Sequence, residues 1–102
     1  MSDLDVTVDQ LETAVVVRAA GEVDSTTAKQ LEEPLLRAAE KGAVQLDLAK
    51  VPYMSSAGLR VLILAAKALQ KRGERLRIIN VAPQIDNVLK LAGFTSFMDI
   101  SL

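Results

Sequence analysis

Hydrophobic and polar residues alternate along several stretches of the chain, with the period of two that a half-buried β-strand shows. The first two stretches, Asp5 to Asp9 and Thr13 to Ala20, follow each other closely and predict a β-hairpin. Two further strands are predicted at 44–48 and 75–78, where apolar even positions alternate with polar odd ones. The polar positions indicate that one sheet face meets water, so helices should cover mainly the other face. They also lead us to expect an arginine of the fourth strand opposite Asp47.

Between the strands, apolar residues recur every three or four positions, which is typical of amphipathic helices. The first helix is predicted over 24–42, with Asp24 or Ser25 as its N-cap and a kink at Pro34. A second helix is predicted to begin at the serines after residue 54 and to end at Gly73, and a third over 83–92. This order of elements predicts one α/β domain over residues 1–102, with right-handed crossovers.

The second helix carries apolar residues on more than one face. One stripe is predicted to face the core, and it consists of Leu59, Leu62, Ile63, Ala66 and Leu69. The remaining apolar positions are Val61, Leu64, Ala65 and Ala68. Two interpretations of this second set stay open, because it forms either an exposed docking patch or a second buried face.

The composition narrows the function. The chain has 102 residues, with 12 basic and 13 acidic ones, and no basic run that would neutralise a nucleic-acid backbone. It lacks cysteine and histidine, which removes thiolate metal sites and the commonest general base. No stretch approaches the ~20 apolar residues of a membrane span, and the acidic segment Met1 to Asp5 is unlike a secretory signal. We therefore expect a cytoplasmic, non-enzymatic protein that needs no metal or cofactor, binds no nucleic acid and does not insert into a membrane.

Two adjacent serines stand where the third strand gives way to the second helix. Ser55 and Ser56 follow Val51-Pro52-Tyr53-Met54 and precede Ala57-Gly58-Leu59. A serine at a helix N-terminus either caps the helix or accepts a phosphate, which the free N–H groups and the helix dipole favour. Taken alone, this short pattern favours the cap.

The order and spacing of several segments carry a more specific signal. The segments are Gly21-Glu22-Val23-Asp24, Val44-Gln45-Leu46-Asp47-Leu48, Tyr53-Met54-Ser55-Ser56-Ala57-Gly58-Leu59 and Leu91-Ala92-Gly93-Phe94. Together they resemble the STAS-domain anti-sigma factor antagonists. The resemblance implies a STAS-like α/β fold, with a mixed four- to five-stranded sheet and helices packed mainly on one face.

The same resemblance implies a role in bacterial partner switching. The unphosphorylated protein would bind an anti-sigma factor that is also a serine kinase, and phosphorylation by that kinase would end the complex. A serine phosphatase acting on the phosphorylated form would restore binding. The alternative is a soluble STAS regulatory subunit of a membrane transport complex.

Carried over by position, the resemblance places the phosphate acceptor at Ser56, with Ser55 as the alternative. It implies partner contacts at Asp24, Ser55, Ala57, Gly58, Arg60, Val61 and Leu64. Many family members have an aspartate before the acceptor, a serine or threonine after it, and a glycine where Arg60 stands. Asp24 therefore has two open interpretations, as a replacement for the missing carboxylate or as a helix cap.

Overall fold

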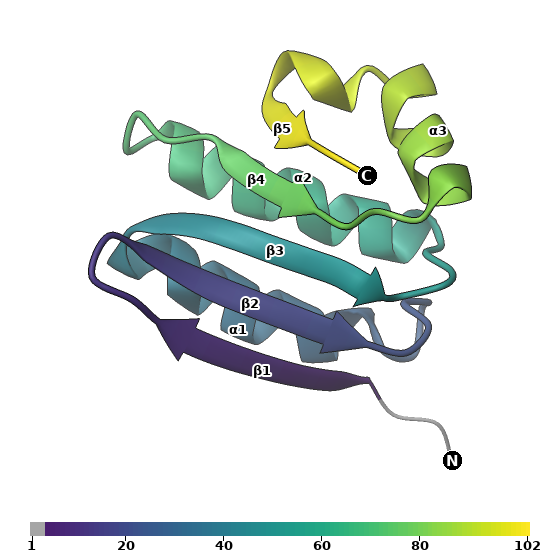
Figure 1. Cartoon of the computed structure of the whole chain (residues 1–102), viewed down its shortest axis with the longest axis horizontal. Helices are drawn as coiled ribbons and strands as arrows, with labels where there is room; N and C mark the ends of the chain where they lie inside the picture. The colour runs from purple at the N-terminus through teal and green to yellow at the C-terminus, as the bar shows by residue number, and fades with distance from the viewer. Residues whose placement is uncertain (1–3) are drawn as a thin grey trace.

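The computed structural model describes residues 4–102, which form a five-stranded sheet with helices (Figure 1). The strands are β1 (Asp5–Gln10), β2 (Ala14–Ala20), β3 (Ala43–Lys50), β4 (Leu76–Ile79) and β5 (Met98–Ile100). The helices are α1 (Ala28–Lys41), α2 (Ser56–Gln70), α3 (Pro83–Leu91) and the short 3-10 helix η1 (Phe94–Ser96). The acidic segment predicted at Met1 to Asp5 lies partly outside the described residues, since these begin at residue 4.

The strands lie in the sheet in chain order. The hairpin of β1 and β2 is antiparallel, and every later neighbour is parallel. The predicted α/β class with a mixed sheet is therefore confirmed, and so is the predicted hairpin. Parallel neighbours require crossover helices, which α1, α2 and α3 supply between successive strands.

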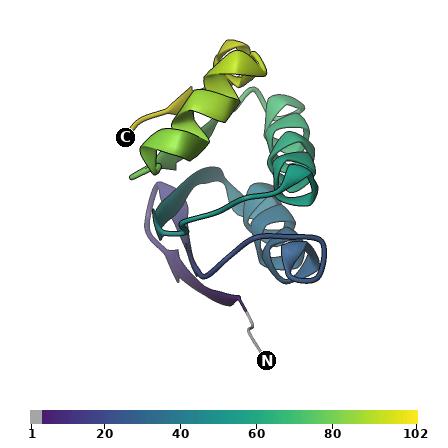
Figure 2. The same ribbon diagram turned by 90° about the vertical axis from the view of Figure 1, so that its right-hand side faces the viewer.

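Helices α1 and α2 lie side by side on one face of the sheet, as Figure 2 shows. The core lies between them and the apolar residues of the central strands, and Leu46, Leu62 and Ile78 are fully buried there. Burial of each such side chain contributes about 1.5–3 kcal/mol. The expectation that helices cover mainly one face is thus confirmed.

The arginine opposite Asp47 comes from β2, and the prediction that β4 supplies it is wrong. Asp47 lies opposite Arg18 on β2 and opposite Ile79 on β4, whereas Arg77 faces Gln45. The register of a parallel pair depends on where the crossover helix returns the chain, which the alternation within a strand does not reveal.

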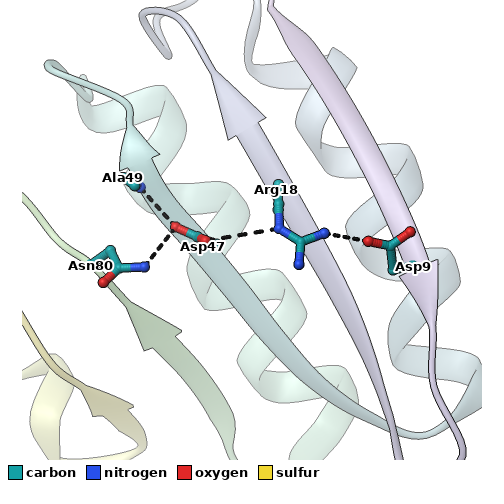
Figure 3. Close-up of polar contacts among 5 residues, drawn as sticks. All are labelled: Asp9, Arg18, Asp47, Ala49 and Asn80. Atoms are coloured by element: carbon teal, nitrogen blue, oxygen red, sulfur yellow. Dashed lines mark hydrogen bonds and ion pairs between the residues drawn. The ribbon is translucent and has the colours of Figure 1, made fainter.

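A row of polar contacts crosses the uncovered sheet face (Figure 3). Arg18 pairs with Asp9 on β1, and its Nε lies 3.9 Å from Oδ2 of Asp47. The other carboxylate oxygen of Asp47 accepts hydrogen bonds from the Ala49 N–H at 2.9 Å and from Asn80 Nδ2 at 3.1 Å. This row ties β1, β2 and β3 together on the face that carries no helix.

The helix ends differ in detail from the prediction. Helix α1 begins at Ala28 because residues 25–27 form a separate turn, and it continues across Pro34 as one helix. Helix α2 ends at Gln70, and residues 71–73 form a turn in which Gly73 has φ +75°. Such a left-handed residue is typical of a chain leaving a helix.

Candidate phosphorylation and partner-binding site

The two loops that carry the predicted site are joined by backbone hydrogen bonds. The Val23 N–H donates to the Tyr53 carbonyl at 3.0 Å, and the Ser55 N–H donates to the Val23 carbonyl at 2.8 Å. Val23 and Met54 thereby form an isolated parallel bridge. Both loops follow the carboxyl ends of parallel strands, at the right-hand end of the sheet in Figure 1. Asp24 and the serines, which directly follow Val23 and Met54, therefore share one end of the sheet.

The two serines have different roles in the backbone. Ser55 is the N-cap of α2, with φ −86° and ψ 179°, and its Oγ accepts a hydrogen bond from the Ala57 N–H at 3.2 Å. Its carbonyl accepts the Leu59 N–H at 3.0 Å, which is the first bond of the helix. Ser55 is half-buried, whereas Ser56 is exposed and is the first residue of α2. The Ser55 hydroxyl is therefore engaged in capping, whereas Ser56 is accessible to solvent.

Asp24 holds the start of the turn that leads into α1. Its Oδ1 accepts hydrogen bonds from the Thr26 hydroxyl at 2.7 Å, the Thr26 N–H at 2.9 Å and the Thr27 N–H at 3.2 Å. The Asp24 carbonyl also accepts the Ala28 N–H at 2.8 Å. These hydrogen bonds hold the pKa of the Asp24 carboxyl below its usual value, and the bond from the Thr26 hydroxyl has the largest effect. These contacts close the turn at residues 25–27, whereas the N-cap of α1 is Thr27, so the prediction that Asp24 or Ser25 caps this helix is wrong.

Gly58 allows α2 to start directly against the joined loops. A Cβ at this position would lie 2.5 Å from Met54 Cγ and 2.7 Å from Val23 Cγ1, closer than side-chain atoms approach. The residue is buried beneath the bridge between these two segments. Its contribution to the site is therefore close packing, and its predicted contact with a partner would need access that this packing denies.

One interpretation of the second apolar set on α2 was an exposed docking patch. This interpretation is wrong for the two central residues of the set. Val61 and Ala65 are 2% and 0% exposed, because α1 lies against this side of α2. Both residues agree with the other interpretation of this set, which is a second buried face of the helix. Val61 therefore cannot contact a partner while the core is intact. Leu64 and Ala68 remain half-buried at the margin.

An apolar groove beside the serines was not predicted. Its walls come from the loop after β3, the first turn of α2 and the first turns of α3. It is lined by Pro52, Tyr53, Met54, Leu59, Gln84, Ile85 and Val88. Tyr53 and Val88 are 51% and 45% exposed. The Gln84 Nε2 donates to the Pro52 carbonyl at 3.2 Å and connects α3 to the serine loop.

Helix α3 is rotated from the orientation that its apolar residues predict. Apolar spacing groups Val88 with Ile85 and Leu89, but the buried residues of α3 are Ile85, Asp86 and Leu89, and Val88 is exposed. The Asp86 carboxylate is paired with Lys90, whose Nζ lies 2.9 Å from Oδ2. Because Asp86 is charged, a prediction based on apolar spacing alone does not assign it to the buried face.

None of the helices in residues 4–102 is long and apolar enough to cross a membrane. Within the same residues, no three side chains of the metal-binding types His, Cys, Asp and Glu cluster together.

A five-stranded mixed sheet, with two serines at the start of the helix that follows its third strand, defines the class to which this molecule belongs. The model of the STAS domain matches residues 5–102, and the chain belongs to the STAS domain family. The anti-sigma-B factor antagonist of Bacillus subtilis is 34% identical over 100 residues, which cover 97% of this chain and 92% of that protein. The anti-sigma-B factor antagonist of Staphylococcus epidermidis is 32% identical over 87 residues, covering 83% and 81%.

Solved structures share the fold. An anti-sigma factor antagonist from Mycobacterium paratuberculosis matches with a TM-score of 0.84 and 23% identity, over 96% of this chain and 85% of that one. The Bacillus cell fate determinant SpoIIAA in its phosphorylated form matches with a TM-score of 0.74 and 19% identity, over 96% and 92%. The STAS-like fold expected from the sequence is therefore confirmed.

Proposed function

We propose that the 102 residues form one STAS domain that acts as an anti-sigma factor antagonist. The relatives of 34% and 32% identity carry this function in their names and match over most of their own length. In the proposed cycle, the unphosphorylated chain binds an anti-sigma factor with serine-kinase activity. Phosphate on Ser56 ends the complex, and a serine phosphatase restores it. The chain is thus a substrate and a cytoplasmic regulator rather than an enzyme.

The main support for the proposal is that the two serines have different roles at the start of α2. The Ser55 hydroxyl is used as the cap of α2, whereas Ser56 is exposed at the first helical position. A phosphate on Ser56 would lie beside the positive end of the helix dipole, where the fold tolerates added negative charge. These observations favour Ser56 over Ser55 as the acceptor.

A phosphate at this position is sufficient to end a complex. It adds about −1.5 to −2 charge at neutral pH. A hundredfold loss of affinity corresponds to about 2.7 kcal/mol, which one desolvated like-charge contact and the bulk of the phosphate can supply. No rearrangement of the fold is required.

The proposed partner surface surrounds Ser56. We retain Asp24, Ala57, Arg60 and Leu64 from the predicted contacts, since each is at least partly exposed. Ser55 belongs to the surface through its position beside the acceptor. The groove lined by Tyr53, Leu59 and Val88 extends this surface toward α3 and offers an apolar partner side chain a place to bind.

Affinity capture of the tagged chain from its native cells tests the proposal. Mass spectrometry should find a kinase-like partner and phosphate on the peptide that contains Ser55 and Ser56. With the purified kinase, Ser56→Ala should abolish phosphate incorporation and Ser55→Ala should retain it. Incorporation that persists in Ser56→Ala and stops in Ser55→Ala would move the acceptor by one residue. Recovery of a transporter ATPase in place of a kinase would support the transport-complex alternative.

A further inference from the structure

The exposed side of α2 carries charge of one sign only. Arg60, Lys67 and Lys71 are all exposed, and the helix contains no aspartate or glutamate. Among residues 4–102, none of the ion pairs involves any of these three cations. Helix α2 therefore presents a row of cations that have no carboxylate partner within the described chain.

Arg60 is the member of this row that lies next to Ser56. Residues four apart share one side of a helix, with Cβ atoms about 5–6 Å apart. A helical side chain also points toward the N-terminus of its helix, so the Arg60 side chain extends toward the turn that contains Ser56. An acidic residue that precedes a basic one by four positions is the more favourable order for such a pair.

The surrounding charges leave this position without an anion in the unphosphorylated chain. The first turn of α2 has no acidic residue, so Arg60 lies near the positive end of the helix dipole with no compensating charge. Glu22 and Asp24 lie in the adjoining loop, where the Asp24 carboxylate is held by Thr26. Lys50 ends β3, on the segment that leads to the serines. The loop carboxylates would repel a phosphate on Ser56, which leaves Arg60 as its cation on α2.

We propose that Arg60 is the counter-ion of the phosphate on Ser56, and that its guanidinium pairs with the phosphate across one turn of α2. A guanidinium suits this role because its planar array of N–H donors matches phosphate oxygens. The inference rests on the proposed function, and it adds the residue that pairs with the phosphate. Phosphorylation then has two effects, since it adds negative charge and also occupies an arginine that the free chain offers to a carboxylate of the partner.

The test measures the phosphate directly. Phosphoserine is installed at position 56 during translation, and the second pKa of the phosphate is measured by ³¹P NMR titration in the otherwise natural chain and in Arg60→Gln. A paired cation stabilises the dianion, so the pKa should be lower in the natural chain by about 0.15 to 0.4 unit. Arg60→Lys should retain part of this difference, because the charge remains while the planar donors are lost.

Lys67→Gln is the matched control. It removes the same charge from the same row, but eleven residues from Ser56, which is about 16 Å along the helix. Screening over this distance should leave a pKa change below about 0.1 unit. The proposal is overturned if Arg60→Gln leaves the pKa unchanged, or if Lys67→Gln changes it equally.

The outcome is independent of whether a kinase modifies Ser56 in cells, because translation supplies the phosphate. A negative result would remove the role of Arg60 and leave the proposed function standing. Failure to find phosphate on Ser56 in cells would have the opposite effect. Arg60 is exposed, so circular dichroism should show the folded state in each variant, and Arg60→Lys supplies a second measurement if the glutamine variant is unstable.

Discussion

Ser55 and Ser56 are adjacent and chemically identical, and the backbone at the start of α2 separates them. Ser55 has the extended conformation of an N-cap and accepts the Ala57 N–H, while Ser56 has entered the helix. A change of one residue in the helix start would exchange the two roles. In the sequence both serines stayed open as acceptors, because Ser55 stands where many family members have an aspartate before the acceptor.

The division between the serines predicts unequal effects of alanine on stability. Ser55→Ala should lower the free energy of unfolding by about 0.5–2 kcal/mol, because the cap of α2 is lost. Ser56→Ala should change it by less than about 0.5 kcal/mol, since alanine suits an exposed helical position. Urea denaturation of the two variants measures both values. Equal destabilisation by both substitutions would contradict the assignment of the cap.

Gly58 is a residue of the site at which the surrounding atoms leave no room for a side chain. Met54 and Val23 occupy the space that a Cβ would need, so Gly58→Ala should lower the free energy of unfolding by about 1–3 kcal/mol through overpacking. The strain falls on the bridge that joins the two site loops, and partner binding should weaken with it.

Gly42→Ala is the control for this substitution. A Cβ at Gly42 meets nothing within 4 Å, and the residue has an extended φ of 166°. Its effect on the free energy of unfolding should stay within about 0.5 kcal/mol. Thermal and urea denaturation compare the two variants, and equal losses would show that crowding at Gly58 is not the cause.

At the level of elements, hydrophobic periodicity predicted the secondary structure well where one face of the element is exposed to solvent. The predicted strands at Asp5 to Asp9 and Thr13 to Ala20 match β1 and β2 within one residue. Strand β5 has three residues, too few for an alternating pattern to show, and it was not located. Helix α2 was harder, because apolar residues surround much of it and only the position of α1 decides which of them are buried.

The candidate site also has one part that the sequence predicts and one part that it does not. The meeting of its two loops follows from parallel strands whose carboxyl ends share an edge, so the sequence was sufficient to place Asp24 beside the serines. The groove between the serine loop and α3 depends on how α3 is rotated. In that rotation Asp86 is buried and Val88 is exposed, and apolar spacing gives no signal for it.

At the level of the whole molecule, the proposed site is a surface feature of a fold whose core lies elsewhere. The core residues lie between the sheet and its helices. Helix α2 begins at the carboxyl end of the parallel strands (Figure 1), and its first residue, Ser56, is exposed. A charge on Ser56 should therefore act on a partner and leave the fold intact. The row of Asp9, Arg18 and Asp47 lies on the open sheet face and contains none of the residues of the proposed site.

This separation predicts that Ser56→Asp weakens partner binding without unfolding the chain. Its dissociation constant for the purified kinase, measured by calorimetry, should rise at least about tenfold, which is about 1.4 kcal/mol, because aspartate carries less charge and bulk than phosphate. Its melting temperature should stay within about 2 °C, since an acidic residue at the first position of α2 suits the helix dipole. Thr95→Asp adds the same charge before β5, at the opposite end of the parallel strands, and should leave both quantities unchanged. Normal binding by Ser56→Asp, equal weakening by Thr95→Asp, or unfolding of the Ser56 variant would each contradict a switch that works by local charge at a surface.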